Sequence, residues 1–416
     1  MLATVTVFPI VISMALSEGK VHELTLKMLD TFISIFLAIL WFNTFRQFME
    51  TFEIAEWFPY ARDFFSMLQV VLLYTIAMWV AWLCRDDLMR VSTFCCCGAH
   101  FIAFAGISAS AEAQASAAAL AGDMFDEPLV FGFVLAAGIF LALMFASNYL
   151  LWRGKTDNHV LNEAVDELEL DVVGLVISFV ATQAIRYELT GHYPPMHLFL
   201  QAASHPVKTE AWQRWFMFLW AVGLAGFALV TVPRLSGLAH HANIPGIERW
   251  VHVTKVILIM MVAWGFLLWG QWEFHEHLFT KQGLFGHMLF AITATLVCLG
   301  VLVAAAKLGK QDTPEQVETF NIITTGISLV AAWSWEHCFN EAFDIIGHEH
   351  QVGYKGLVPK LVLSIIVPAA MLPVYLSHVR PRVLQFHQAH AAGHRHGHEG
   401  EASSHHRTPH AEAAHA

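Results

Sequence analysis

The feature that most constrains this chain is a series of apolar stretches, each about as long as a membrane-spanning helix, which needs ~20 mostly apolar residues. Ten such stretches follow an apolar N-terminal segment, at residues 28–49, 64–84, 93–113, 128–152, 172–189, 212–232, 250–269, 285–306, 320–343 and 359–378. Because a chain in lipid must satisfy its own backbone hydrogen bonds, these stretches are predicted to be α-helices. The sequence therefore predicts an all-α polytopic membrane protein with about ten or eleven transmembrane helices.

The composition agrees with this class and excludes others. Hydrophobic residues make up 56% of the 416 residues and charged residues 14%, whereas soluble domains have ~45–50% and ~25%. The formal net charge of −11 leaves no basic surface of the kind that binds nucleic acid. Six cysteines in this length do not indicate a disulfide framework. The sequence has no Walker A, GxGxxG, HExxH or GxSxG motif that would indicate a known catalytic site.

An internal repeat is the second organising feature. Apolar helices that begin with the dipeptide Ile-Ser start at Ile33, Ile177 and Ile327, about 150 residues apart, and the helices between them keep the same phase. Because each unit contains an even number of helices, successive units have the same orientation in the membrane. They therefore form parallel repeats of the kind that transporters use. The predicted units are an N-terminal membrane segment 1–18, a four-helix repeat 19–168, a second four-helix repeat 169–316, a half repeat of two helices 317–380 and a tail 381–416.

Lysine and arginine set the expected orientation. They concentrate in one set of loops, which includes Lys20, Arg85, Arg249 and Arg380. By the positive-inside rule, these loops and the C-terminal tail are predicted to be cytoplasmic in an integral multi-pass membrane protein. Residues 1–18 have no basic residue before their apolar stretch, which favours a membrane segment over a cleaved signal peptide.

Ionisable residues inside the spans are the first candidate site. Each costs ~2.5–3.5 kcal/mol at the centre of a membrane helix and therefore needs a partner or a function. When the repeats are aligned on Ile-Ser, Arg186 and Glu336 fall at equivalent positions, and we expect them to meet as an ion pair inside the bundle. This pair is predicted to form a polar path or gate; a structural ion pair, or a position at the outer interface, is the alternative. The polar neighbours assigned to the same site are Gln183, Glu188 and His337.

Histidines give weaker candidates. The tripeptide His-Glu-His occurs twice on the predicted non-cytoplasmic side, with histidines at His275, His277, His348 and His350. In an extended loop alternate side chains point the same way, and imidazoles with carboxylates suit Zn²⁺ or Cu²⁺ or a pH sensor. Ordinary surface histidines are the alternative. His287, inside a predicted span, is expected to hydrogen-bond a neighbouring backbone group.

Two further groups of residues carry expectations. Near the cytoplasmic end of the span 250–269, Lys255 is expected to extend to the membrane surface beside His252, whose counterpart in the first repeat is His100. From His378 to the end of the sequence there are ten histidines, and the tail has too little apolar content to fold. Its histidines are weak candidate ligands for transition metals, and a neutral biased tail is the alternative. The tail histidines assigned in this way are His394, His396, His398, His405 and His406.

Three functional classes stay open at this point. An ion channel or secondary transporter, gated at contacts between repeats, accounts for the repeats and the intramembrane charges, with protons or divalent metal ions as the expected substrates. A non-catalytic scaffold or subunit of a larger membrane complex is the alternative, and a membrane-embedded metal or haem enzyme is the third class. The expected partners are the lipid bilayer and a small ion or solute. The chain could also belong to an oligomer or a larger complex, and nucleic acid is excluded as a partner. No catalytic residue is assigned, and the one cofactor considered is Zn or another transition metal.

Overall fold

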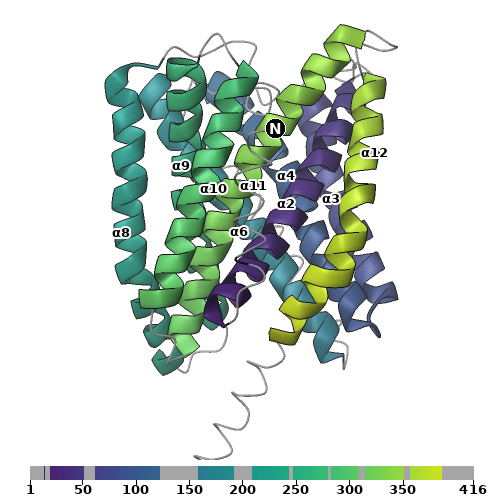
Figure 1. Ribbon diagram of the computed structural model, residues 1–416, viewed down its shortest axis with the longest axis vertical. Coiled ribbons are helices and arrows are strands. Elements are labelled where there is room, and N and C mark those ends of the chain that lie inside the picture. Colours follow the sequence, from purple (N-terminus) through teal and green to yellow (C-terminus); the bar gives the residue numbers. More distant parts are fainter. Residues whose placement is uncertain are drawn as a thin grey trace, which may run out of the picture.

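The computed structural model describes residues 14, 19–50, 61–121, 158–191, 209–242, 247–279, 283–308, 314–350 and 357–386. Nearly all of these residues are helical, and there is no strand among them (Figure 1). The elements are α2 (Lys20–Glu50), α3 (Ala61–Leu83), α4 (Leu88–Ala121), α6 (His159–Thr190), α8 (Ala211–Ala242), α9 (Ile247–Gly270), η2 (Gln271–Leu278), α10 (Gly283–Leu308), α11 (Pro314–His350), α12 (Leu357–Val374) and η4 (Tyr375–Val379).

The all-α membrane class is confirmed for the described part of the chain. Eight of its helical segments are long and apolar enough to cross a membrane. Nine of the ten predicted stretches coincide with described helices, whereas 128–152 and nearly all of 1–18 lie outside the described residues. The helix α11 is not among the eight, because polar residues such as Asn321, Glu336 and His337 interrupt its apolar sequence. Its 37 residues make a helix ~55 Å long, so it extends well beyond a hydrocarbon core of ~30 Å.

Five helices form a ring around a central axis. The helix α2 packs against α4, α4 against α6, α6 against α9, α9 against α11, and α11 closes the ring on α2. Residues near the beginning of each ring helix line one shared cavity, as Asp30, Cys96, Asp171, His252 and Thr324 do. The five ring helices therefore start at the same end of the bundle, which we call the cavity end, and run parallel to one another.

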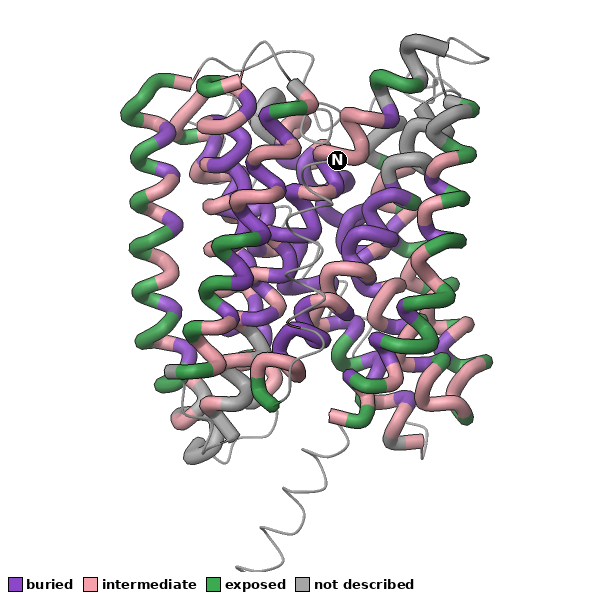
Figure 2. Tube along the Cα trace, in the orientation of Figure 1, coloured by how far each residue is buried: buried purple, intermediate pink, exposed green. Residues whose placement is uncertain are grey.

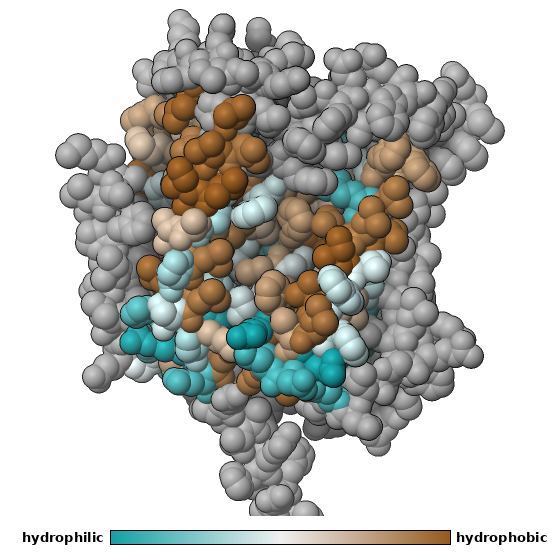
Figure 3. Space-filling model, turned by 90° about the vertical axis from the view of Figure 1, so that its right-hand side faces the viewer, coloured by the Kyte–Doolittle hydropathy of each residue, from teal (hydrophilic) through white to brown (hydrophobic). Residues whose placement is uncertain are grey.

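The remaining helices cover the ring from outside. The helix α3 packs on α4, α8 on α9, α10 on α11, and α12 on α2 and α11. Buried residues gather on the ring helices and exposed residues on the outer ones, such as α8 (Figure 2). On the side where α3 and α12 lie, hydrophobic side chains cover the upper part of the face and hydrophilic side chains gather at its lower edge (Figure 3). This is the distribution that a helix bundle in a bilayer requires.

Local sequence explains where the ring helix α6 begins and ends. The Asn158 side chain accepts a hydrogen bond of 3.1 Å from the Leu161 backbone N–H and so caps the first turn. The same side chain donates to the Arg85 carbonyl oxygen, which ties α6 to the turn between α3 and α4. At the other end, Gly191 adopts φ +70°, a left-handed conformation that glycine takes without strain.

Candidate functional site

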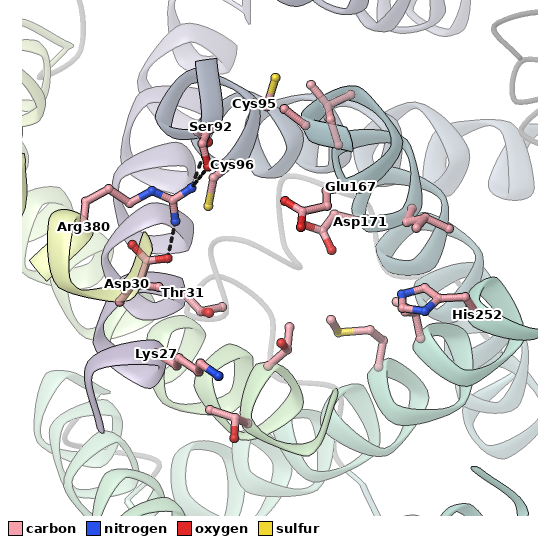
Figure 4. A pocket seen from close by; sticks show the side chains of 18 residues that line it. Lys27, Asp30, Thr31, Ser92, Cys95, Cys96, Glu167, Asp171, His252 and Arg380 are labelled. Atoms are coloured by element: carbon pink, nitrogen blue, oxygen red, sulfur yellow. Dashed lines mark hydrogen bonds and ion pairs between the residues drawn. The ribbon is translucent and has the colours of Figure 1, made fainter. Parts of the chain in front are cut away.

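The main candidate site is a cavity of about 280 Å³ inside the ring at its cavity end (Figure 4). We call it the carboxylate cavity. All five ring helices contribute to its wall, and Arg380, just after η4, closes one side. Its polar lining residues are Lys27, Asp30, Thr31, Ser92, Cys95, Cys96, Glu167, Asp171, His252, Thr324, Thr325 and Arg380.

Two carboxylates of α6 point into this cavity. Glu167 and Asp171 are four residues apart and therefore share one face of the helix. Both point toward the centre of the ring (Figure 4), and both remain accessible to solvent although they lie inside the bundle. Asp171 interacts electrostatically with His100 of α4 and His252 of α9. Within the described ranges no lysine or arginine forms an ion pair with either carboxylate, so the negative charge faces the cavity.

A buried ion pair closes the wall opposite α6. Arg380 donates to Asp30 of α2 and to the Ser92 backbone carbonyl of α4, the latter at 3.0 Å. The Tyr375 hydroxyl donates to the other Asp30 carboxylate oxygen at 2.9 Å. Asp30 and Arg380 are 6% and 5% exposed. The end of α12 is thus fixed between two ring helices, and the charge of Asp30 is compensated within the protein.

At the opposite end of the ring, three buried histidines meet from three helical elements. His275 of η2 stacks on His287 of α10 with ring centroids 4.1 Å apart, and His287 lies 5.9 Å from His337 of α11, nearly parallel to it. We call these three residues the histidine cluster. The His337 Nε2 atom lies 2.7 Å from the Gln271 side-chain nitrogen and also accepts the indole N–H of Trp333.

The structure corrects the interpretation of the two His-Glu-His segments. They were expected to be extended, but His275 and His277 lie in the π-helical segment η2, which continues α9. On a helix, residues two apart point to different sides, so His275 is buried whereas His277 is exposed. The backbone of His348 and His350 is helical too, at the end of α11, and their side chains lie outside the described part of the structure.

The predicted polar pair lies inside the bundle. Arg186 and Glu336 are 6% and 0% exposed, and Gln183 and His337 are also buried, whereas Glu188 is exposed. Arg186 interacts electrostatically with Glu276 of η2 and lies 5.8 Å from the centroid of the Trp272 ring. The pairing of Arg186 with Glu336 stays a prediction. The interaction with Glu276 was not predicted, because the turn that carries Glu276 was taken to be a loop.

A second ion pair lies beside Glu276. Arg214 of α8 forms an ion pair of 2.9 Å with Glu273 of η2, and the Thr209 hydroxyl donates to Glu276 at 3.4 Å. Glu273 and Glu276 lie three residues apart on η2, and their carboxylates interact with Arg214 of α8 and with Arg186 of α6. This network and the histidine cluster together form the polar end of the ring opposite the carboxylate cavity.

The sequence analysis missed the carboxylate cavity. No site role was predicted for Asp30, Glu167 or Asp171, and Arg380 was counted among the basic loop residues that set the expected orientation. The available signal was the pair Glu167 and Asp171, one helical turn apart at the start of an apolar stretch.

The expectation for Lys255 is also corrected. Lys255 is 3% exposed, so it is buried rather than extended to the membrane surface.

The described residues offer no metal-binding group of three or more histidine, cysteine, aspartate or glutamate side chains. The stacked rings explain this for the histidine cluster, because a metal ion needs in-plane lone pairs that converge, and nearly parallel stacked rings direct theirs past one another. The tail histidines His394, His396, His398, His405 and His406 lie outside the described ranges. None of the six cysteines forms a disulfide bond.

The fold and the site together define a class. The chain is an α-helical multi-pass membrane protein with a polar interior at both ends of a helical ring. Comparison of the chain with protein-family models, with curated proteins and with solved structures found no match. The function therefore has to be argued from the site itself.

Proposed function

We propose that this protein is an ion channel or secondary transporter for a small cation, a proton or a divalent metal ion, and that the pathway runs along the axis of the five-helix ring. The observation that carries the proposal is the carboxylate cavity. Glu167 and Asp171 face it from within the ring, in contact with solvent. Among the described residues no arginine or lysine forms an ion pair with either of them, and Arg380 interacts with Glu167 only electrostatically, across the cavity.

The cost of these charges favours transport over a purely structural role. An ionisable group at membrane depth costs ~2.5–3.5 kcal/mol on insertion scales, and a scaffold gains nothing from two of them on one cavity wall. A cation pathway does gain, because carboxylates at its mouth concentrate and partly desolvate the permeating ion. The neighbouring pair of Asp30 and Arg380 is compensated and contributes little net charge.

Helix packing supports the repeated unit on which the proposed gating depends. The first and third helices of each expected unit pack together, as α2 with α4 and α6 with α9. The second helix packs outside the third, as α3 on α4 and α8 on α9. Such equivalent contacts are expected of parallel repeats around one axis. We propose that gating occurs where these units meet, with Arg186 and Glu336 as the pair that couples them.

Flux measurements with cavity variants test the proposal. The purified full chain is reconstituted in liposomes that contain a pH-sensitive or a Zn²⁺-sensitive dye, and a membrane potential drives the ion. We expect flux in the wild type and a loss of about tenfold or more in the variant Glu167→Gln/Asp171→Asn, because an interaction with a charged group is worth ~1.5–3 kcal/mol and 1.4 kcal/mol corresponds to tenfold.

The control is Asp86→Asn, which removes an exposed carboxylate in the turn between α3 and α4, outside the cavity wall. We expect its flux to match that of the wild type. A wild type that carries neither ion would overturn the proposal in favour of a scaffold. Equal losses in the two variants would show that surface charge, and not the cavity, controls the flux.

A further inference from the structure

Four aromatic side chains form a layer across the ring. Phe104 of α4, Phe179 of α6, Trp264 of α9 and Trp333 of α11 are each at most 2% exposed. The centroids of the Trp264 and Trp333 rings lie 4.6 Å apart, those of Phe104 and Trp333 5.0 Å, and those of Phe179 and Trp264 5.2 Å. The four rings, which we call the aromatic layer, thus form a chain of contacts that crosses the ring from α4 to α11 and continues through α9 to α6.

The aromatic layer lies between the two polar ends of the ring. Along α11, Thr325 lines the carboxylate cavity, Trp333 belongs to the layer and His337 to the histidine cluster. The eight residues from Thr325 to Trp333 span ~12 Å of helix. The same order holds along α6, from Asp171 through Phe179 to Arg186. An ion that follows the axis therefore has to pass this layer, which excludes water as it stands.

Hydrogen bonds hold the two tryptophans of the layer in place. The Trp264 indole N–H donates to the Ser178 hydroxyl at 3.0 Å, and the Trp333 indole N–H donates to His337 Nε2, four residues further along α11. An indole nitrogen can only donate, so His337 Nε2 must be the acceptor and carries no proton. His337 is therefore neutral in this structure, and of the two acceptors, His337 and the Ser178 hydroxyl, it alone is a base that can take up a proton.

Protonation of His337 would place a positive charge next to other titratable side chains. The titratable groups that face it among the described residues are His287 of α10 and, behind it, His275 of η2, while Glu336 adjoins it on α11. From α9 and α4 the layer presents the apolar rings of Trp264 and Phe104, and α2 and α12 pack on α11 through apolar side chains. Three imidazoles this close together repel a second positive charge, so the cluster takes up one proton at a time.

We propose that His337 and Trp333 form a proton-operated gate. A proton that binds at His337 Nε2 occupies the lone pair that now accepts the Trp333 indole N–H and that the Gln271 side-chain nitrogen also approaches. The indole loses its acceptor, Trp333 is released from the aromatic layer, and the two polar ends of the ring become connected. The inference rests on the proposed transport function and identifies the proton as the ligand of the histidine cluster.

Two substitutions at one position give opposite predictions. In His337→Gln the side-chain oxygen still accepts the indole N–H but cannot be protonated in this range, so the gate stays closed and flux stays low at every pH. In His337→Ala the hydrogen bond from the Trp333 indole to residue 337 is lost at every pH, so flux is high and independent of pH. In the wild type we expect voltage-driven flux, corrected for proton concentration, to rise about tenfold when both sides are acidified from about pH 8 to about pH 4, a range that extends well to both sides of the ordinary imidazole pKa of ~6.5.

Ser178→Ala is the matched control. It removes the acceptor of the other tryptophan, Trp264, without removing a titratable group. Flux at high pH should therefore increase, while the part of the flux that rises on acidification should persist because His337 is intact. A His337→Gln variant that is activated by acid like the wild type would overturn the gate, and so would equal behaviour of the glutamine and alanine variants.

The outcomes separate this inference from the proposed function. If the wild type carries flux that depends on Glu167 and Asp171 but the His337 variants keep normal acid activation, the gate alone is wrong. If the wild type carries no flux, the transport function fails and the gate with it. Nitrogen NMR of histidine-labelled protein, compared with His337→Gln, gives a readout independent of flux: the gate requires the His337 Nε2 signal to be that of an unprotonated nitrogen at high pH.

Discussion

Single residues at the cavity end show how this protein keeps charge inside a membrane bundle. Asp30 is bound by Arg380 and by the Tyr375 hydroxyl, and Arg380 in turn donates to Ser92, so each charge has several partners. Glu167 and Asp171, in contrast, face the cavity. The two kinds of carboxylate imply two roles, because a compensated ion pair fixes helices together whereas an accessible carboxylate can bind a mobile cation.

The ion pair predicts a stability difference between single and double variants. Asp30→Ala leaves the buried Arg380 without its counter-charge, and we expect it to lower the free energy of unfolding by ~3–5 kcal/mol. The double variant Asp30→Leu/Arg380→Met removes both charges and should lose much less. Unfolding followed by tryptophan fluorescence in detergent measures both. Equal losses in the single and double variants would mean that the pair does not act as a unit.

Among the helical elements, close packing of the ring depends on glycine at particular positions. A Cβ atom on Gly174 of α6 would lie 2.3 Å from Val256 Cγ1 of α9, whereas nothing lies within 4 Å of a Cβ atom on Gly223 of α8. Small residues let membrane helices approach closely. The ring helices α6 and α9 therefore touch through backbone and a β-branched side chain that has little freedom to move away.

This contact predicts a position-specific effect of adding one methyl group. We expect Gly174→Ala to lower the free energy of unfolding by ~1–3 kcal/mol, because overpacking forces the helices apart. Gly223→Ala, on the outer helix α8, should be neutral or slightly stabilising, since alanine is the better helix former. Thermal unfolding in detergent compares the two variants. A loss in Gly223→Ala as large as that in Gly174→Ala would contradict the packing described for the ring.

The helical elements were predictable from the sequence to a greater degree than the sites were. The length of an apolar stretch is a local property, so the described helices lie where the stretches predict them. The π-helical turn of η2 was missed, because the polar residues of Gln271–Leu278 read as a loop. Its helical form separates His275 from His277 and brings His275 to His287 of another helix. Such convergence depends on how helices pack and is not encoded in local spacing.

On the scale of the whole molecule, three layers follow one another along one axis: the carboxylate cavity, the aromatic layer and the histidine cluster. Four of the five ring helices contribute to the aromatic layer, and all five line the cavity. Parallel ring helices are what the predicted four-helix repeat requires, because each unit would return the chain to the same side, and the repeat itself stays a prediction. The order of the three layers depends on side chains from several units and was visible only in the structure.

Two adjacent cysteines of α4 test this arrangement most directly. Cys96 lines the carboxylate cavity inside the ring, whereas Cys97 lines an apolar groove between α2, α3, α4 and α12 on its outside. Each is retained as the single cysteine of an otherwise cysteine-free chain in liposomes and treated with a charged, membrane-impermeant thiol reagent. We predict that Cys96 reacts when the reagent is added on the side of the cavity end and does not react when it is added on the opposite side. Modification of Cys96 should stop the ion flux. Cys97 should stay unmodified. An inert Cys96, or a Cys97 that reacts equally fast, would contradict a water-filled pathway through the ring.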